Sequence, residues 1–110
     1  MSDSPDVAVI DYGMGNLFSV RRACEWAGLT VVVTHDPDAL THAKGVILPG
    51  VGAFGDAMQT LRQLRMDSAI QEVAREQKPL MGICLGMQLL MSRSFEFGEH
   101  AGLNIIEGDV

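Results

Sequence analysis

Residues 79–88 read Pro-Leu-Met-Gly-Ile-Cys-Leu-Gly-Met-Gln, and they decide the fold because an apolar run passes through Gly82-Ile83-Cys84-Leu85-Gly86 into helix-forming sequence. The run at 79–83 predicts a buried strand, and residues 85–92 predict a helix. A glycine two residues before and two residues after a central cysteine is typical of a nucleophile elbow. Gly82 and Gly86 fit because a strained turn leaves little room for side chains on its flanks. Cys84 is therefore the candidate nucleophile.

Apolar runs of the same kind occur along the rest of the chain, with helical periodicity between them. Strands are expected at residues 7–10, 30–34, 45–48 and 103–106, and helices at 16–27, 36–43 and 56–77. The last helix should break near Met66, with Asp67 and Ser68 capping its second part. The repeated strand-helix order predicts an α/β fold, an open and mostly parallel sheet with helices on both faces. We expect residues 1–110 to be the N-terminal part of a single domain, truncated after its last strand.

Composition and charge narrow the classes of protein. The 110 residues carry a formal charge of −6 with scattered Lys and Arg, so no nucleic-acid partner is expected. No apolar run approaches the roughly 18–20 residues that span a bilayer, so no membrane segment is expected. Residues 1–6 lack the features of a secretory signal and should form a short frayed end. Cys24 and Cys84 stand in unlike contexts, which predicts neither a disulfide nor a paired metal-ligand site and favours a reducing cytoplasm. No cofactor is expected.

A second glycine-rich segment, Pro49-Gly50-Val51-Gly52, follows the third predicted strand. Ligands normally bind at the carboxyl ends of parallel strands, where this segment and the elbow both lie. The N–H of Leu85 and an N–H from Val51 or Gly52 would form an oxyanion hole, each donor lowering the barrier by about 3 kcal/mol. Taken alone, the segment also fits a plain turn. Cys24 lies on the apolar face of the first predicted helix and is expected to fill the core.

Three blocks occur in order along the chain: DYGMGNL at residues 11–17, LPGVGAF at 48–54 and GICLGMQ at 82–88. Together they resemble the class I glutamine amidotransferases, and in particular the glutaminase subunit of imidazole glycerol phosphate synthase. The resemblance extends over nearly the whole chain. It implies the flavodoxin-like fold of that family.

The resemblance also implies roles for single residues. Cys84 would attack the side-chain amide of glutamine, while Val51, Gly52 and Leu85 hold the oxyanion. Gln88 and Glu96 would bind the amino-acid end of the substrate. A glutamyl thioester would form and be hydrolysed. The ammonia would pass to a cyclase subunit with a (β/α)8 barrel, which makes imidazole glycerol phosphate in histidine biosynthesis.

A cysteine nucleophile of this kind needs a histidine that moves protons and a carboxylate that orients the histidine. The family has both in a His-x-Glu segment that would follow residue 110, so the 110-residue chain alone is expected to be inactive. His35, His42 and His100 match no such segment and are expected at the surface or in caps. Of the three, His100 is the one to test if the chain proves active.

Alternatives remain open at this point. The chain can belong to another class I glutamine amidotransferase or a related cysteine hydrolase, or it can be a catalytically silent fragment that only docks on the cyclase. Gly13-Met14-Gly15-Asn16-Leu17-Phe18, with Asp36 after the next strand, also resembles a dinucleotide-binding fingerprint. That fingerprint requires a small residue where the helix meets the strand, and the bulk of Phe18 argues against it.

Overall fold

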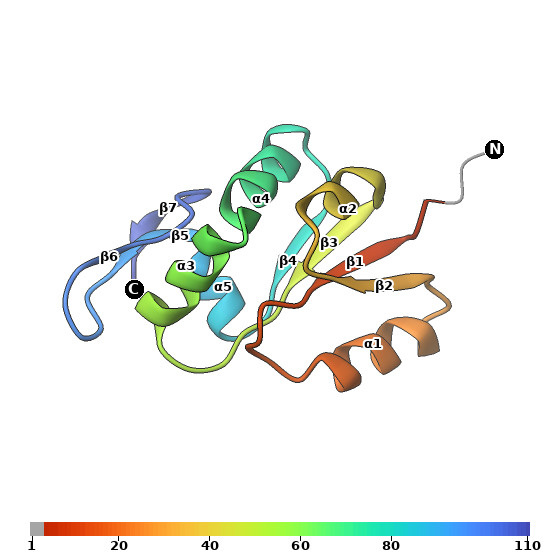
Figure 1. Ribbon diagram of the computed structural model, residues 1–110, viewed down its shortest axis with the longest axis horizontal. Coiled ribbons are helices and arrows are strands. Elements are labelled where there is room, and N and C mark those ends of the chain that lie inside the picture. The colour runs from red at the N-terminus through yellow and green to blue at the C-terminus, as the bar shows by residue number, and fades with distance from the viewer. Residues whose placement is uncertain (1–3) are drawn as a thin grey trace.

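The structure is a computed structural model that describes residues 4–110 (Figure 1). Over this part of the chain, no helix has both the length and the apolar character that a bilayer crossing requires. The predicted fraying of residues 1–3 lies outside the described residues. Asp6, by contrast, is tied to the fold, because its backbone N–H donates to Thr30 Oγ1 at 2.8 Å. The expectation of a frayed end is therefore wrong for Asp6.

Four parallel strands form the main sheet, in the order β2-β1-β3-β4. Their bounds are β1 Val7–Ile10, β2 Val31–Thr34, β3 Gly45–Leu48 and β4 Leu80–Gly82. The register places Val9 of β1 between Val33 of β2 and Ile47 of β3. Continuous apolar runs rich in β-branched residues suit strands that are covered on both faces. The order 2-1-3-4 is that of a flavodoxin-like sheet, and the predicted fold class is confirmed.

Helices cover both faces of this sheet (Figure 1). α1 (Leu17–Trp26) packs on one face, where the buried thiol of Cys24 contacts the cluster around Val9 and Ile47. Asn16 caps α1 as predicted, since its side chain accepts a hydrogen bond from the Ser19 N–H at 3.1 Å. The other face carries the remaining helices: α2 Pro37–His42, α3 Phe54–Gln63, α4 Met66–Arg75 and α5 Leu85–Leu89.

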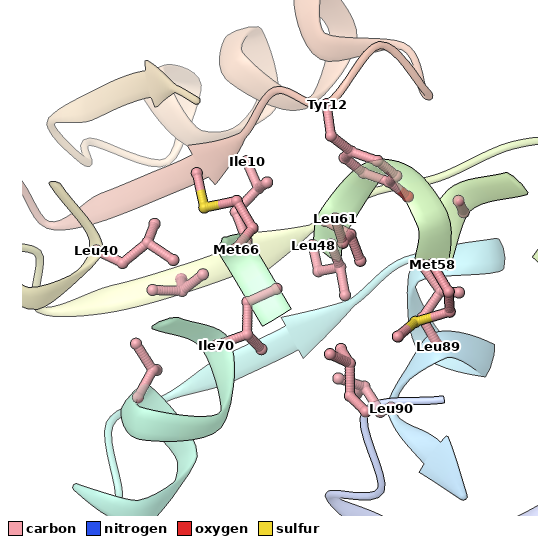
Figure 2. Close-up of a cluster of buried hydrophobic side chains, with 14 of the residues drawn as sticks. Ile10, Tyr12, Leu40, Leu48, Met58, Leu61, Met66, Ile70, Leu89 and Leu90 are labelled. Atoms are coloured by element: carbon pink, nitrogen blue, oxygen red, sulfur yellow. The ribbon is translucent and has the colours of Figure 1, made fainter. Parts of the chain in front are cut away.

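The main hydrophobic core lies between the sheet and the helices α2 to α5 (Figure 2). Ile10 and Leu48 of the sheet lie in it with Leu61, Met66 and Ile70 of the helices, and all five side chains are fully buried. Burial of a side chain of this size stabilises the fold by about 1.5–3 kcal/mol. The core therefore fixes the carboxyl ends of β1 and β3, from which the loops of the candidate site extend.

A second, three-stranded sheet was not predicted. It lies at the end of the molecule away from β2, in the order β6-β5-β7 (Figure 1). Its strands are β5 Met91–Ser94, β6 His100–Ala101 and β7 Ile106–Asp109. The helix predicted over residues 85–92 and the strand predicted over 103–106 are both wrong in their bounds, because α5 ends at Leu89 and β7 begins at Ile106.

Tertiary hydrogen bonds explain this difference. The carbonyl of Leu89 accepts from the N–H of Leu103 at 2.8 Å, and the carbonyl of Leu90 accepts from the N–H of Ile105 at 2.8 Å. These carbonyls are at the end of α5, where further helical turns would otherwise have used them. Residues 103–105 thus end the helix instead of adding a strand to the main sheet.

The helical stretch predicted over residues 56–77 breaks near Met66 as predicted and forms α3 and α4. It begins two residues early, at Phe54, and the division falls at Arg65, whose φ of 59° lies in the left-handed region. No side-chain hydrogen bond caps α4, so the predicted capping by Asp67 and Ser68 is wrong. The left-handed residue turns the chain sharply, and Met66 and Ile70 can then point into the same core as Leu61.

Candidate active site

Cys84 occupies the turn between β4 and α5. Its φ of 55° and ψ of −122° lie in a region that residues with a Cβ rarely adopt, which costs of order 1–3 kcal/mol and is common at functional turns. The thiol is exposed, whereas the other free cysteine, Cys24, is buried as predicted. The nucleophile-elbow geometry predicted from the sequence is present. An exposed sulfur in this turn is accessible to a substrate.

The flanking glycines are required by close approaches of the backbone. A Cβ added at Gly86 would collide with the Leu48 carbonyl oxygen, and one added at Gly82 would lie 2.6 Å from Met87 Cα. Neither glycine has a positive φ, so the need is for space and not for an unusual conformation. The steric role predicted for Gly82 and Gly86 is confirmed. The same approach brings α5 directly onto the end of β3.

The segment 49–52 lies beside the elbow. The N–H of Leu85 donates to the carbonyl of Gly50 at 3.2 Å, so one predicted oxyanion donor is paired with the backbone of the loop that supplies the other. Val51 is 59% exposed, and Gly52 has a φ of 102° with open space around its Cα. The structure brings Leu85 and this loop together, while their roles in catalysis stay predictions.

Tyr12 is a residue of this site that the sequence analysis missed. It follows β1, and its hydroxyl donates to the carbonyl of the buried Pro49 at 2.6 Å. The residue is 4% exposed, and burial raises the pKa of the phenol well above its ordinary value. A Cβ on Gly50 would collide with Tyr12 Oη. The neutral phenol therefore holds the 49–52 loop at the switch point between β1 and β3. The sequence feature that could have identified Tyr12 is its position just after a predicted strand.

The two predicted substrate-binding residues come from different elements. Gln88 is half-buried on α5, one helical turn after the elbow, and its backbone N–H donates to the Cys84 carbonyl at 3.4 Å. Glu96 is exposed in the turn between β5 and β6, and its Oε1 accepts from the N–H of Phe54 at 3.3 Å. Phe54 follows Gly52 by two residues. Glu96 is thus linked to the loop beside the elbow, although 42 residues separate it from Phe54.

The remaining candidates have structural surroundings of their own. His35 is exposed, and His42 is exposed with its Nδ1 2.9 Å from the Asp38 carbonyl oxygen at the end of α2. Phe18 is 70% exposed on α1, so its bulk does not oppose packing of α1 on the sheet. The argument from the bulk of Phe18 against a dinucleotide-binding site is therefore wrong. Among residues 4–110, no cluster of three or more His, Cys, Asp or Glu side chains is arranged to hold a metal ion.

The comparison with protein families identifies the class. The model of the CobB/CobQ-like glutamine amidotransferase domain matches residues 8–110. The chain belongs to the glutamine amidotransferase family. A solved structure described as a crystal structure of glutamine amidotransferase has a TM-score of 0.80 and 20% identity, and the match covers 94% of this chain and 55% of that chain. At this level of identity the likeness shows the shared fold.

Curated relatives narrow the family to one branch. Proteins described as imidazole glycerol phosphate synthase subunit HisH are 57% identical over 104 residues in Moorella thermoacetica and 53% identical over 104 residues in Sulfurimonas denitrificans. The HisH subunit of Aquifex aeolicus is 52% identical over 103 residues. Each match covers 93% or 94% of this chain and 50% of the relative. The chain spans about half the length of the curated relatives it matches.

Proposed function

We propose that this chain is the nucleophile-bearing part of the glutaminase subunit of imidazole glycerol phosphate synthase. It would release ammonia from glutamine for a cyclase subunit with a (β/α)8 barrel, in the histidine pathway and in the cytoplasm. The level of identity to HisH subunits supports this branch over other class I amidotransferases. Residues 1–110 would form the first part of one domain, and a histidine and a glutamate from the rest of that domain would complete the site.

The observation that carries the proposal is the exposed thiol of Cys84 in its strained turn, next to the 49–52 loop. Cys84 Sγ would attack the amide carbon of glutamine, and the C–N bond breaks as the histidine delivers the thiol proton to the departing nitrogen. Ammonia leaves, and a glutamyl thioester remains on Cys84. Water then cleaves the thioester and releases glutamate and the free thiol.

Val51, Gly52 and Leu85 would stabilise the oxyanion of both steps. The Leu85 N–H is hydrogen-bonded to the Gly50 carbonyl. That carbonyl must therefore turn away before the Leu85 N–H can donate to the substrate. Rotation of the Gly50–Val51 peptide would free Leu85 and direct the Val51 N–H to the same point. The exposure of Val51 and the open space at Gly52 support such a movement.

Gln88 and Glu96 would hold the amino-acid end of glutamine. The exposed carboxylate of Glu96 suits the ammonium group of the substrate, and Asp56 lines the same cavity of about 380 Å³. Gln88 lies one helical turn from the nucleophile and can donate or accept through its amide. The two side chains would thus orient the amide carbon toward Cys84.

The proposal is tested with the full-length gene product and its cyclase subunit. We expect glutamine hydrolysis, selective alkylation of Cys84 by a glutamine-like electrophile, and loss of both in Cys84→Ala. Cys24→Ala is the matched control, and it should retain both because Cys24 is buried on the far face of the sheet. Glutaminase activity that persists in Cys84→Ala would refute the assignment. Formation of imidazole glycerol phosphate from glutamine identifies the branch.

A further inference from the structure

The β5–β6 hairpin, whose turn carries Glu96, is held against α3 by one contact at the start of the helix and one near its end. Glu96 Oε1 accepts from the N–H of Phe54 at 3.3 Å, and Arg62 Nη2 donates to the Ala101 carbonyl at 2.9 Å. Figure 1 shows the β5–β6 hairpin alongside α3. The Glu96 contact is long for a hydrogen bond, and Glu96 is exposed although Phe54 is buried. The backbone N–H of Glu96 donates to Ser94 Oγ at 3.1 Å, and this bond leaves the placement of the carboxylate to other contacts of the turn.

The ring of His100 supplies such a contact. A Cβ built on Gly55 would lie 2.7 Å from His100 Cε1 and 2.8 Å from Nδ1, so the ring occupies the space that a side chain at position 55 would need. The φ of Gly55 is not in the left-handed region. A side chain at position 55 would therefore displace the ring, while the backbone itself does not require glycine there.

The same ring also fixes the turn that follows Glu96. His100 Nε2 lies 3.1 Å from the Phe97 carbonyl oxygen, and the turn needs φ values of 55° at Phe97 and 100° at Gly98. His100 thus connects the start of α3 to the residue next to Glu96. Removal of the ring would leave the strained turn free to relax and to carry the carboxylate away from Phe54.

We infer that His100 is a positioning residue, which sets the affinity for the amino-acid end of glutamine through Glu96. The inference rests on the proposed function. His100 packs on α3 and on its own turn, and it lines the cavity beside Glu96 and Asp56, whereas none of the elbow residues 82–86 lines that cavity. Its loss should therefore weaken substrate binding and leave the chemical step at Cys84 nearly unchanged.

The experiment measures steady-state glutaminase kinetics of the full-length gene product with its cyclase subunit. In His100→Ala we expect the KM for glutamine to rise about tenfold while kcat changes less than about twofold. Gly55→Ala should raise KM in the same way, because the new methyl group displaces the ring. His35→Ala, at an exposed histidine elsewhere, is the matched control and should change neither constant.

The double variant gives a second readout. Both single changes remove the same contact, so Gly55→Ala should raise KM no further in the His100→Ala background. His100→Phe keeps a flat ring over Gly55 but lacks the nitrogen that faces the Phe97 carbonyl, so it should recover only part of the affinity. An unchanged KM in Gly55→Ala and His100→Ala, or a kcat that falls as much as kcat/KM, would overturn the inference while the wild type remains active. If His100→Ala does not fold, the Gly55→Ala result decides. A wild type without glutaminase activity overturns the proposed function as well.

Discussion

The backbone of Cys84 gives a prediction about stability. In Cys84→Gly, the positive φ of 55° is no longer strained, which should return about 1–3 kcal/mol. Glycine also makes the unfolded chain more flexible, at a cost of roughly 0.5–1 kcal/mol. Because the thiol is exposed, little buried surface is lost. The net expectation is a gain of about 0–2.5 kcal/mol over Cys84→Ala, centred on about 1 kcal/mol, because Cys84→Ala keeps the Cβ and therefore the strain.

Thermal and urea unfolding of the purified wild type and of both variants measure this difference. A gain of this size should raise the unfolding midpoint of Cys84→Gly by about 5 °C relative to Cys84→Ala. Both variants should lack glutaminase activity. The wild type would thus keep a cysteine at position 84 for catalysis at a cost in stability. A Cys84→Gly protein that is less stable than Cys84→Ala would show that the turn is not strained, and the reasoning from the elbow would fail.

Two further predictions concern contacts that hold the site and the first strand. Tyr12→Phe removes the donor to the buried Pro49 carbonyl and should lower the free energy of unfolding by about 1–3 kcal/mol in urea titrations, and an unchanged midpoint would contradict the role of this bond. The backbone N–H of Thr30 and the ammonium of Lys44 hold the pKa of Asp6 below its ordinary value of 3.8. Because the folded pKa is lowered, this stabilisation is present above the unfolded pKa and is lost as the pH falls through the folded pKa. The difference in thermal midpoint between wild type and Asp6→Asn should thus be constant near neutral pH and shrink below about pH 3.8. A difference that stays constant over the whole pH range would refute the link between the ionisation of Asp6 and stability.

Much of the candidate site was predictable from local sequence. The glycines at positions 82 and 86 mark a turn whose backbone cannot tolerate side chains, and the structure shows the collisions that a Cβ would cause. Cys24 was predictable as a core residue because it lies on the apolar face of α1. These are properties of a few neighbouring residues. They depend little on the rest of the fold.

The errors occurred where distant segments meet. Residues 90–92 have helix-forming character, yet α5 ends because Leu103 and Ile105 donate to its last carbonyls. Phe18 was assigned to the helix-strand contact, but the rotation of α1 on the sheet leaves it in solvent. The spacing of apolar residues along the chain gives neither hydrogen-bond partners 14 and 15 residues away nor the rotation of a helix on the sheet.

The sequence by itself determined the strand and helix order, the elbow with its cysteine, and the carboxyl edge of the sheet as the place of the site, because each follows from backbone sterics and short-range periodicity. Only the tertiary structure decided which groups meet there. Tyr12 reaches Pro49 across 37 residues and Glu96 reaches Phe54 across 42. The core brings β1, β3 and α3 together, and it also holds Leu90 and Leu103, which precede and follow the β5–β6 hairpin. Such pairings depend on the packing of whole elements, which acts between residues that no local pattern connects.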